Sequence, residues 1–409
     1  MIAKKFYSVI SCMSFMPCMV NNFSTRIRFP FIMKYSYFTC LLILFACYCY
    51  GQNGVTGFSM PSFAPAVQKD GSILFRLRAP AARQVFVKIE GTSIPLQKNK
   101  NGVWSGTSKK MEPDIYQYSY NVDSLSIVDP SNPLTRSSYG GTGQSLVLVP
   151  GKTAEKWEQQ DVPHGSVTRE VYKSAIIGDI REFYVYTPPG YDPKDNKKYP
   201  VLFLLHGMGD DARGWIQTGA ADVIIDNLIA DGKVTPMIFV TTLGYGVADA
   251  VAGPKSFDQF TKSLTDEIIP FVEKKYNAST QRAIAGLSMG GAQAMMAGLN
   301  HPELFKWIGA FSSAFMMYGI AEMGSGSKMP SLDSIYNKTF PAADSGINEQ
   351  IKLLFISCGK SDFLLGNNHD FMKWLSARKI NFQSKEPPGA HSWMVWRRNL
   401  IEFAPLLFR

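Results

Sequence analysis

A serine between two glycines is the residue of this chain best suited to nucleophilic chemistry. Residues 286–290 read Gly-Leu-Ser-Met-Gly, so Ser288 is the centre of a G-x-S-x-G pattern. The apolar residues before it predict a short strand, and the residues from Met289 onward predict a helix. Such a turn exposes the serine hydroxyl, and the flanking glycines avoid steric clashes. The pattern predicts Ser288 as the nucleophile of acyl transfer; an ordinary Gly/Ser turn is the alternative.

A serine nucleophile needs a histidine base, and the base needs a carboxylate that orients it. After a strand–serine–helix turn, the expected chain order is Ser, then Asp or Glu, then His. His391 lies in a Pro- and Gly-containing loop before a predicted final helix, so we expect it to be the base. Asp362 follows a buried strand and is the expected carboxylate, with helix capping as its alternative role. Asp370 and Glu386 are the reserve carboxylates.

The tetrahedral intermediate of acyl transfer needs two backbone N–H groups that stabilise its oxyanion. The N–H of Met289, directly after the nucleophile, is one expected donor. The other is expected from the loop His206-Gly207-Met208-Gly209, with Met208 as the donor. We expect His206 to support this loop rather than to transfer protons.

The elements that must position these groups are strands alternating with helices. Continuous apolar runs at 201–205, 237–240 and 353–356 are typical of strands that are covered on both faces. Between them, residues 258–276 carry apolar side chains at helical spacing. This alternation predicts a mostly parallel sheet flanked by helices, and with the serine turn it predicts an α/β-hydrolase fold over residues 168–409.

The preceding region has a different pattern. Residues 73–78, 85–89 and 116–122 are short, largely alternating runs rich in β-forming residues, separated by turn signals. They predict a small immunoglobulin-like β-sandwich domain over residues 52–130. Residues 131–167 contain a Gly-rich stretch with little periodicity and are the expected linker.

Composition and charge limit the classes of function. The chain has 409 residues, of which 45% are hydrophobic and 18% charged, which suits two globular units. The formal net charge is +9, but residues 1–51 hold +5 of it and no acidic residue, so nucleic acid is not an expected partner. Five of the six cysteines precede residue 52, and Cys358 stands alone after it, so we expect no internal disulfide in the mature fold.

Residues 1–51 predict a signal peptide region. Lys34 precedes the apolar run 35–46, and small residues before Gln52 resemble a cleavage site. The run is too short to predict a membrane span. Met33 is the expected initiator if the start is overextended, and lipidation at Cys47 is the less favoured alternative to simple cleavage.

Together, these residues resemble the esterase D-like branch of the α/β hydrolases, particularly carbohydrate esterase family 1. The landmarks extend over about residues 170–405 and are the stretches 199–207, 286–291, Cys358-Gly359 with Asp362, and 389–393 with Trp396. The resemblance implies Ser288 as nucleophile, His391 as base and Asp362 as its partner. It also implies Trp215 and Trp393 as substrate-binding residues, with core packing as the alternative for Trp215.

The β domain resembles the immunoglobulin-like modules related to carbohydrate-binding module family 48. The matching residues are Asp70-Gly71, Ala79-Pro80, Asn101-Gly102-Val103-Trp104 and Val128-Asp129-Pro130. Trp104 stands where such modules place a core residue, so glycan binding, a spacer role and a wall of the active-site cleft all remain open.

The resemblance implies an exported, bacterial serine carboxylic ester hydrolase that removes feruloyl or acetyl groups from xylan-type plant polysaccharides. The expected partner is an ester-decorated polysaccharide or oligosaccharide, with no metal or organic cofactor. A siderophore trilactone (enterobactin-type) esterase is the alternative enzyme, and an inactive glycan-binding surface protein is the alternative of another class. The acyl preference depends on loops such as 244–255 and 315–345.

Overall fold

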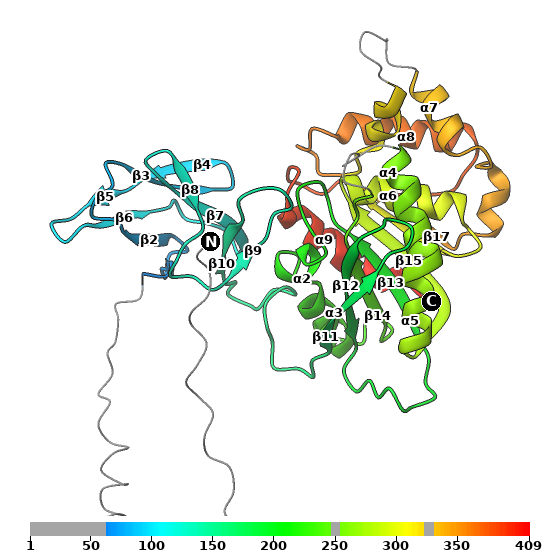
Figure 1. Ribbon diagram of the computed structural model, residues 1–409, viewed down its shortest axis with the longest axis horizontal. Coiled ribbons are helices and arrows are strands. Elements are labelled where there is room, and N and C mark those ends of the chain that lie inside the picture. Colours follow the sequence, from blue (N-terminus) through cyan, green and yellow to red (C-terminus); the bar gives the residue numbers. More distant parts are fainter. Residues whose placement is uncertain (1–62, 247–253, 323–330) are drawn as a thin grey trace, which may run out of the picture. The chain divides into compact units, whose positions relative to one another are not determined.

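A central eight-stranded sheet forms the core of the C-terminal part of the chain (Figure 1). The computed structural model describes residues 63–246, 254–322 and 331–409. Described residues from Phe63 onward belong to one compact unit. The predicted signal peptide region, with Met33 and Cys47, lies outside the described residues, as do parts of the two loops expected to shape the acyl pocket.

The strands of this sheet follow the order β11-β12-β14-β13-β15-β16-β17-β18. The first two pairings, β11 with β12 and β12 with β14, are antiparallel, and all later ones are parallel. The strand bounds are β11 Ser166–Lys173, β12 Ile180–Thr187, β13 Tyr199–Leu205, β14 Ile238–Thr242, β15 Ala278–Leu287, β16 Trp307–Phe311, β17 Leu353–Ser357 and β18 Gln383–Lys385.

Helices cover both faces of the sheet, which explains the uninterrupted apolar strands. In β13, Val201 and Phe203 point into one buried cluster while Leu202 and Leu204 point into another, because successive side chains of a strand alternate in direction. The first cluster is completed by the helical segments α4 Pro254–Ser263, η1 Leu264–Ile268, α5 Ile269–Lys275, α6 Met289–Asn300, η2 Phe315–Glu322, α7 Leu332–Thr339, η3 Ser345–Glu349 and α8 Leu365–Ala377. The second is completed by α2 Gly214–Gln217, α3 Ala221–Ala230, α9 Trp393–Phe403 and η4 Ala404–Leu406.

The helix predicted over residues 258–276 begins four residues earlier in the structure and contains a wider, π-helical turn in its middle. Helical structure extends from Pro254 to Lys275, with a π-helical turn at Leu264–Ile268. Pro270 follows this turn, and a proline has no N–H for the carbonyl four residues earlier. The wider turn relieves that misfit without ending the helical segment.

The N-terminal part of the described chain contains two antiparallel sheets, ordered β1-β2-β6-β5 and β4-β3-β7-β10-β9, with β8 paired to β7 (Figure 1). Buried side chains from both sheets, among them Phe75, Trp104, Val87 and Tyr118, form one cluster. Trp104 is therefore a core residue. The strand bounds are β1 Ala66–Val67, β2 Ile73–Arg78, β3 Val85–Ile89, β4 Thr92–Pro95, β5 Gln97–Lys98, β6 Val103–Thr107, β7 Asp114–Val122, β8 Leu125–Ile127, β9 Thr135–Arg136 and β10 Gln144–Val149.

The structure corrects the expected linker at residues 131–167. Strand β10 pairs along β7, and β9 pairs with β10, so residues 135–149 belong to the six-stranded sheet. Trp157 lies in the second cluster of the hydrolase part, and Ser166 begins β11. Strand β9 has only two residues, too few side chains to show alternation, and is held by backbone hydrogen bonds.

Candidate active site

Ser288 occupies a strained backbone conformation between β15 and α6. Its φ is 53° and its ψ is −116°, a region that residues with a side chain rarely adopt. The surrounding backbone holds it there: the N–H of Ser288 donates to the Phe311 carbonyl at 2.9 Å, and its carbonyl accepts from Ala314 at 3.0 Å. A non-glycine residue in such a conformation marks a site where strain is retained for function. This is the sharp turn that the G-x-S-x-G pattern predicts.

The two glycines of the pattern are required by close backbone contacts. A Cβ at Gly286 would lie 2.3 Å from the Gly290 carbonyl oxygen. A Cβ at Gly290 would lie 2.4 Å from the His206 carbonyl oxygen. Both distances are shorter than any side chain tolerates, so the spacing of the pattern reflects the packing of the turn against the loop after β13.

His391 and Asp362 form a hydrogen-bonded pair. The Nδ1 atom of His391 lies 2.9 Å from Oδ2 and 3.1 Å from Oδ1 of Asp362. The Asp362 side chain is completely buried, whereas that of His391 remains 19% exposed. Since a carboxylate only accepts hydrogen bonds, Nδ1 is the donor of this pair, and Nε2 is the ring nitrogen left to take a proton from a nucleophile.

Asp362 is ionised in this environment. Burial alone would raise the pKa of Asp362, but the hydrogen bonds from His391 and from the Leu364 amide outweigh burial and hold that pKa below its usual range. The Leu364 N–H donates to Oδ1 at 2.9 Å, in the segment that follows β17. The carboxylate therefore keeps its charge while it orients the histidine.

The reserve carboxylates lie elsewhere. Asp370 pairs with Lys373 at 3.0 Å on the surface of α8. Glu386 accepts from Nε2 of His369 at 2.7 Å, and both of these side chains are about 40% exposed. The structure thus brings Asp362, rather than Asp370 or Glu386, to His391.

Ser288 and His391 line one cavity of about 210 Å³. Gly207, Met208 and Leu287 also line it, as do Trp393 and Trp396. The ring of Trp396 meets the His391 ring edge to face, with centroids 4.9 Å apart, and Phe363 packs against the same imidazole at 4.7 Å. Phe363 is 77% exposed, so it covers His391 from the solvent side.

The loop that carries Met208 is held by a neutral histidine. His206 Nε2 accepts from the Gly244 amide at 2.9 Å, so its proton resides on Nδ1, which donates to the Gly207 carbonyl at 2.8 Å. Complete burial lowers the pKa of His206, which keeps the ring uncharged. His206 is therefore a support for the loop. The N–H of Met289 is the first of helix α6, at the end where helix amides lack intrahelical partners.

Trp215 is not a cavity residue, which corrects the expectation that it binds substrate. Its side chain is 0% exposed and its Nε1 donates to the Leu205 carbonyl at 3.0 Å. It packs edge to face on Trp393, with centroids 5.2 Å apart. The family resemblance implies a place in the acyl pocket with core packing as the alternative, and the indole lies in the second buried cluster. Trp393 is 2% exposed and does border the cavity.

Sequence reasoning missed the residues that the N-terminal sheets contribute to this cavity. Glu90, Gln117, Arg136 and Gln144 all line it, together with Asp210 of the Met208 loop. No motif marks them, because each lies alone in a strand or turn. The only available signal was the alternation in β7, which assigns Gln117 to the face opposite the buried Tyr116 and Tyr118.

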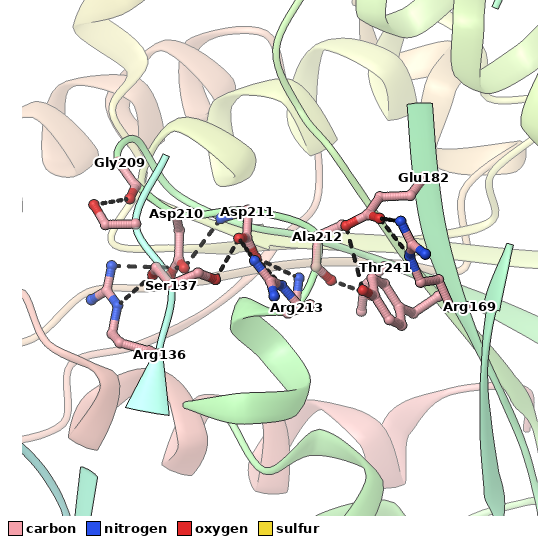
Figure 2. Close-up of polar contacts among 12 residues, drawn as sticks. Arg136, Ser137, Arg169, Glu182, Gly209, Asp210, Asp211, Ala212, Arg213 and Thr241 are labelled. Carbon is pink, nitrogen blue, oxygen red and sulfur yellow. Dashed lines mark hydrogen bonds and ion pairs between the residues drawn. The ribbon is translucent and has the colours of Figure 1, made fainter. Parts of the chain in front are cut away.

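Residues 136–139 contact the Met208 loop directly, as part of Figure 2 shows. The Ser138 hydroxyl and the Tyr139 amide both donate to the Gly209 carbonyl, at 3.0 and 3.1 Å. Ser137 donates to Asp211, and the Arg136 guanidinium lies 3.7 Å from Asp210 (Figure 2). We call residues 136–139 the strap. Among the residues described, no group of three or more His, Cys, Asp or Glu side chains is arranged to hold a metal ion.

The sheet order, the serine turn and the His–Asp pair define an α/β-hydrolase. Residues 174–407 match the model of the esterase family described as "Putative esterase". This match spans more than half of the chain, and the chain belongs to that esterase family.

Known proteins resemble the chain over different extents. It is 31% identical over 363 residues to an endo-1,4-beta-xylanase/feruloyl esterase of Xylanibacter ruminicola, a match that covers 84% of this chain and 46% of that protein. A CE1 ferulic acid esterase from Anaeromyces mucronatus superposes with a TM-score of 0.53 at 25% identity, over 63% of this chain and 96% of that one. The enterobactin esterase of Shigella flexneri superposes with a TM-score of 0.64 at 18% identity, over 84% and 96%, which shows a shared fold.

The chain spans less than half the length of the first two curated relatives that it matches. Residues 166–409 make up about 60% of the chain. A superposition over 84% must therefore extend into the N-terminal sheets, so their combination with an α/β-hydrolase recurs in a solved structure.

Proposed function

We propose that this protein is a serine carboxylic ester hydrolase that uses Ser288, His391 and Asp362 as a catalytic triad. One observation carries the proposal: Ser288, on its strained turn, lines the same cavity as His391, whose Nδ1 is bonded to the buried Asp362 at 2.9 Å. Nucleophile, base and orienting carboxylate are the three parts that acyl transfer from an ester requires.

In the proposed first half-reaction, the Ser288 hydroxyl attacks the ester carbonyl while Nε2 of His391 removes its proton. Asp362 stabilises the imidazolium that forms, and its own low pKa keeps it ionised during this step. The amides of Met289 and Met208 bind the developing oxyanion. The dipole of helix α6, whose N-terminus begins at Met289, adds to this stabilisation.

The intermediate then collapses and releases the alcohol. His391 protonates the departing alkoxide, which leaves an acyl ester on Ser288. A water molecule that gives its proton to His391 attacks this ester, and the acid departs. The water forms the new C–O bond and the Ser288 oxygen recovers the proton, so the enzyme returns to its starting state without any cofactor.

The proposed substrates are feruloyl or acetyl esters on xylan-type polysaccharides or oligosaccharides. The names of the relatives support this choice, since they include a xylanase/feruloyl esterase and, at 26% identity over 50% of this chain, an acetyl esterase of Caldicellulosiruptor saccharolyticus. Trp393 and Trp396, with Met208 and Leu287, provide apolar lining that suits an acyl group.

We further propose that the two N-terminal sheets form an immunoglobulin-like β-sandwich related to carbohydrate-binding module family 48. The cluster that both sheets share supports this assignment. Export through residues 1–51, to the periplasm, the cell surface or the medium of a bacterium, is part of the same proposal. Among the residues that the structure covers, no helix is both long and apolar enough to cross a membrane.

A siderophore trilactone esterase is the second candidate enzyme. The likeness to the enterobactin esterase is a likeness of fold, and a curated enterobactin esterase matches at 20% identity. An inactive glycan-binding protein is the third candidate, and the complete Ser288, His391 and Asp362 set argues against it.

An assay panel tests the proposal. Methyl ferulate, feruloylated arabinoxylan, acetylated xylan and a catecholate trilactone are each incubated with the wild type and with Ser288→Ala. We expect release of ferulate or acetate by the wild type and loss of release by the variant. Full activity of Ser288→Ala towards every cleaved ester would overturn the proposed mechanism. Cleavage of the trilactone and of no other ester in the panel would overturn the proposed substrate class.

A further inference from the structure

A second cavity, of about 450 Å³, lies beside helix α9. Among the residues that the structure describes, none lines both this cavity and the first cavity, which contains Ser288. We infer that the second cavity is a binding site for a neutral aromatic ester, which it recognises through the N–H groups of Trp157 and Asn399. Its volume is typical of sites for small organic molecules. The proposed function uses the first cavity alone, so this site is an addition to it.

Helix α9 separates the two cavities. Trp393 and Trp396, which line the first cavity, are three residues apart and share one side of the helix. Arg398, Ile401 and Glu402 line the second cavity, and at 3.6 residues per turn they project from the opposite side. Each cavity can therefore hold its own ligand.

Two buried N–H groups at the second cavity have no hydrogen-bond partner within the described part of the chain. They are Nε1 of Trp157 and Nδ2 of Asn399. Trp157 is 5% exposed and Asn399 is 2% exposed, and both line the cavity. The side-chain carbonyl of Asn399 is occupied, because it accepts from the Ser357 hydroxyl at 2.9 Å. Buried donors without partners are rare in folded proteins, so an acceptor oxygen of a ligand is the group that both donors need.

The rest of the lining suits the body of an aromatic ligand. Its apolar members are Trp157, Phe355, Pro387 and Ile401. The Arg398 guanidinium lies 4.7 Å from the centroid of the Trp157 ring and is itself bound to Asp114 at 2.7 Å, so the ring has a fixed neighbour on one face. An aromatic ester combines a flat apolar ring with a carbonyl oxygen that accepts hydrogen bonds.

The segment that carries Trp157 is held in place by helix α3. The Asn227 side chain donates from Nδ2 to the carbonyls of Lys156 and Glu158, at 2.9 and 3.0 Å. These two bonds fix the residues on either side of Trp157. The position of its N–H is therefore set before a ligand binds, which lowers the cost of binding.

The charged groups around the second cavity favour a neutral ligand over an anion. The lysines and the arginine that line it are each paired with a carboxylate of the protein: Lys156 with Asp231, Lys385 with Glu402, and Arg398 with Asp114. Glu155 and Glu386 line the cavity as well and add acidic groups. A bound carboxylate would meet cations that are already neutralised, so an ester should bind better than its parent acid.

A feruloyl group on a polysaccharide is an ester of this class. A polysaccharide with several such groups can place one at Ser288 and another in the second cavity, and two attachments hold it more strongly than one. This use of the site rests on the proposed function, whereas the binding of an aromatic ester does not.

Indole N–H resonances test the binding directly. The protein carries seven tryptophans, which are labelled with ¹⁵N in a Ser288→Ala background and titrated with methyl ferulate. The Trp157 resonance, assigned by its loss in Trp157→Phe, should shift because its N–H gains an acceptor. The Trp104 resonance is the internal control and should stay in place, since its Nε1 already donates to the Ala79 carbonyl at 2.9 Å.

Two results of this titration would overturn the inference. A Trp157 resonance that does not move with methyl ferulate would show that the cavity takes no such ligand. A response to ferulate as strong as that to methyl ferulate would show that the ligand class is wrong. Ile401→Trp places a larger side chain in the second cavity and should abolish the Trp157 shift, whereas Val171→Trp, at an exposed position in β11, should not.

Kinetics with the wild-type serine test the use of the site. Trp157→Phe and Ile401→Trp should each raise KM for feruloylated arabinoxylan about fivefold and leave kcat/KM for methyl ferulate within about twofold, because the polymer alone loses its second attachment. Trp307→Phe is the matched control, since Trp307 is buried in the same cluster as Trp157 and lines neither cavity. Urea unfolding checks that each variant is folded.

The outcomes for the site and for the proposed function are distinguishable. An unchanged KM for the polymer in both cavity variants overturns its second attachment, while continued release of ferulate leaves the proposed function standing. Retained release by Ser288→Ala would instead overturn the proposed function, and the Trp157 shift would still decide whether the second cavity binds an aromatic ester.

Discussion

The guanidinium of Arg397 and the carboxylate of Asp114 form an ion pair from which solvent is almost excluded. Their side chains are 0% and 2% exposed, and Nη2 of Arg397 lies 2.5 Å from Oδ1 of Asp114. Arg397 belongs to helix α9, which begins two residues after His391, and Asp114 is the first residue of β7. The pair therefore joins the N-terminal sheets to the helix that follows the proposed catalytic base.

Breaking this pair from one side is expected to destabilise the whole unit. Asp114→Ala leaves Arg397 buried without its counter-charge, which typically costs about 3–5 kcal/mol in free energy of unfolding. Arg397 keeps its bonds to the Thr218 and Ile115 carbonyls, at 2.6 and 2.7 Å, and these offset only part of the loss. Urea unfolding of both proteins measures the difference.

The matched control is the exposed pair of Lys373 and Asp370. Asp370→Ala should change the free energy of unfolding by less than about 1 kcal/mol, because water already solvates both charges. Equal effects of Asp114→Ala and Asp370→Ala would show that the buried pair does not hold the two parts together.

The proposed triad should behave as one unit in mutant kinetics. Ser288→Ala and His391→Ala should each reduce kcat by roughly 10⁵–10⁶, and the double variant should be no worse than either alone. The reason is that Ser288 is not deprotonated without His391, and His391 has no nucleophile to deprotonate without Ser288. Independent, multiplying losses measured with methyl ferulate would contradict the assignment.

The strap should affect the oxyanion step rather than substrate affinity. Ser138→Ala removes a hydrogen bond to the carbonyl of Gly209, the residue after Met208 in the same loop. A displaced oxyanion donor costs less than a lost one, so we expect kcat to fall about tenfold on methyl ferulate with KM nearly unchanged. Ser105→Ala, an exposed change in β6, is the control. A rise in KM at constant kcat would place the effect in binding instead.

Acid stability should reflect the low pKa of Asp362. In the folded state this pKa lies below its unfolded value, because hydrogen bonds from His391 and Leu364 outweigh burial. The stabilisation is therefore complete above the unfolded pKa of about 4, and it is lost as pH falls through the folded value. Urea unfolding between pH 7 and pH 3 should show the wild type losing its advantage over Asp362→Asn below about pH 4. If the stability advantage of the wild type over Asp362→Asn grew as pH fell, the pKa of Asp362 would have to be higher in the folded state than in the unfolded state.

Trp215 should matter for stability and not for substrate choice. Trp215→Phe removes the bond from Nε1 to the Leu205 carbonyl and leaves a gap beside Trp393, at a cost of about 1–3 kcal/mol. The ratio of kcat/KM between methyl ferulate and 4-nitrophenyl acetate should change less than twofold. An altered ratio with unaltered stability would return Trp215 to the acyl pocket.

Local chain geometry explains which parts of the site were predictable. The strand, serine and helix around Ser288 are contiguous, so glycine spacing alone reports how tightly the turn packs. Asp362 follows its strand and His391 precedes its helix, and the edge of a parallel sheet brings such segments together. The α/β arrangement followed from apolar runs whose length reflects coverage on both faces.

What the sequence determined by itself was therefore the nucleophile turn, the order of the triad candidates and the layered sheet, because each depends on neighbouring residues or on strand periodicity. Only the tertiary structure decided that Trp215 faces the core, that part of the expected linker forms β9 and β10, and that Gln117, Arg136 and Gln144 border the cavity. These outcomes depend on how two distant parts of the chain pack against each other, through contacts such as that of Asp114 with Arg397. Packing across such a separation leaves no local pattern in the sequence.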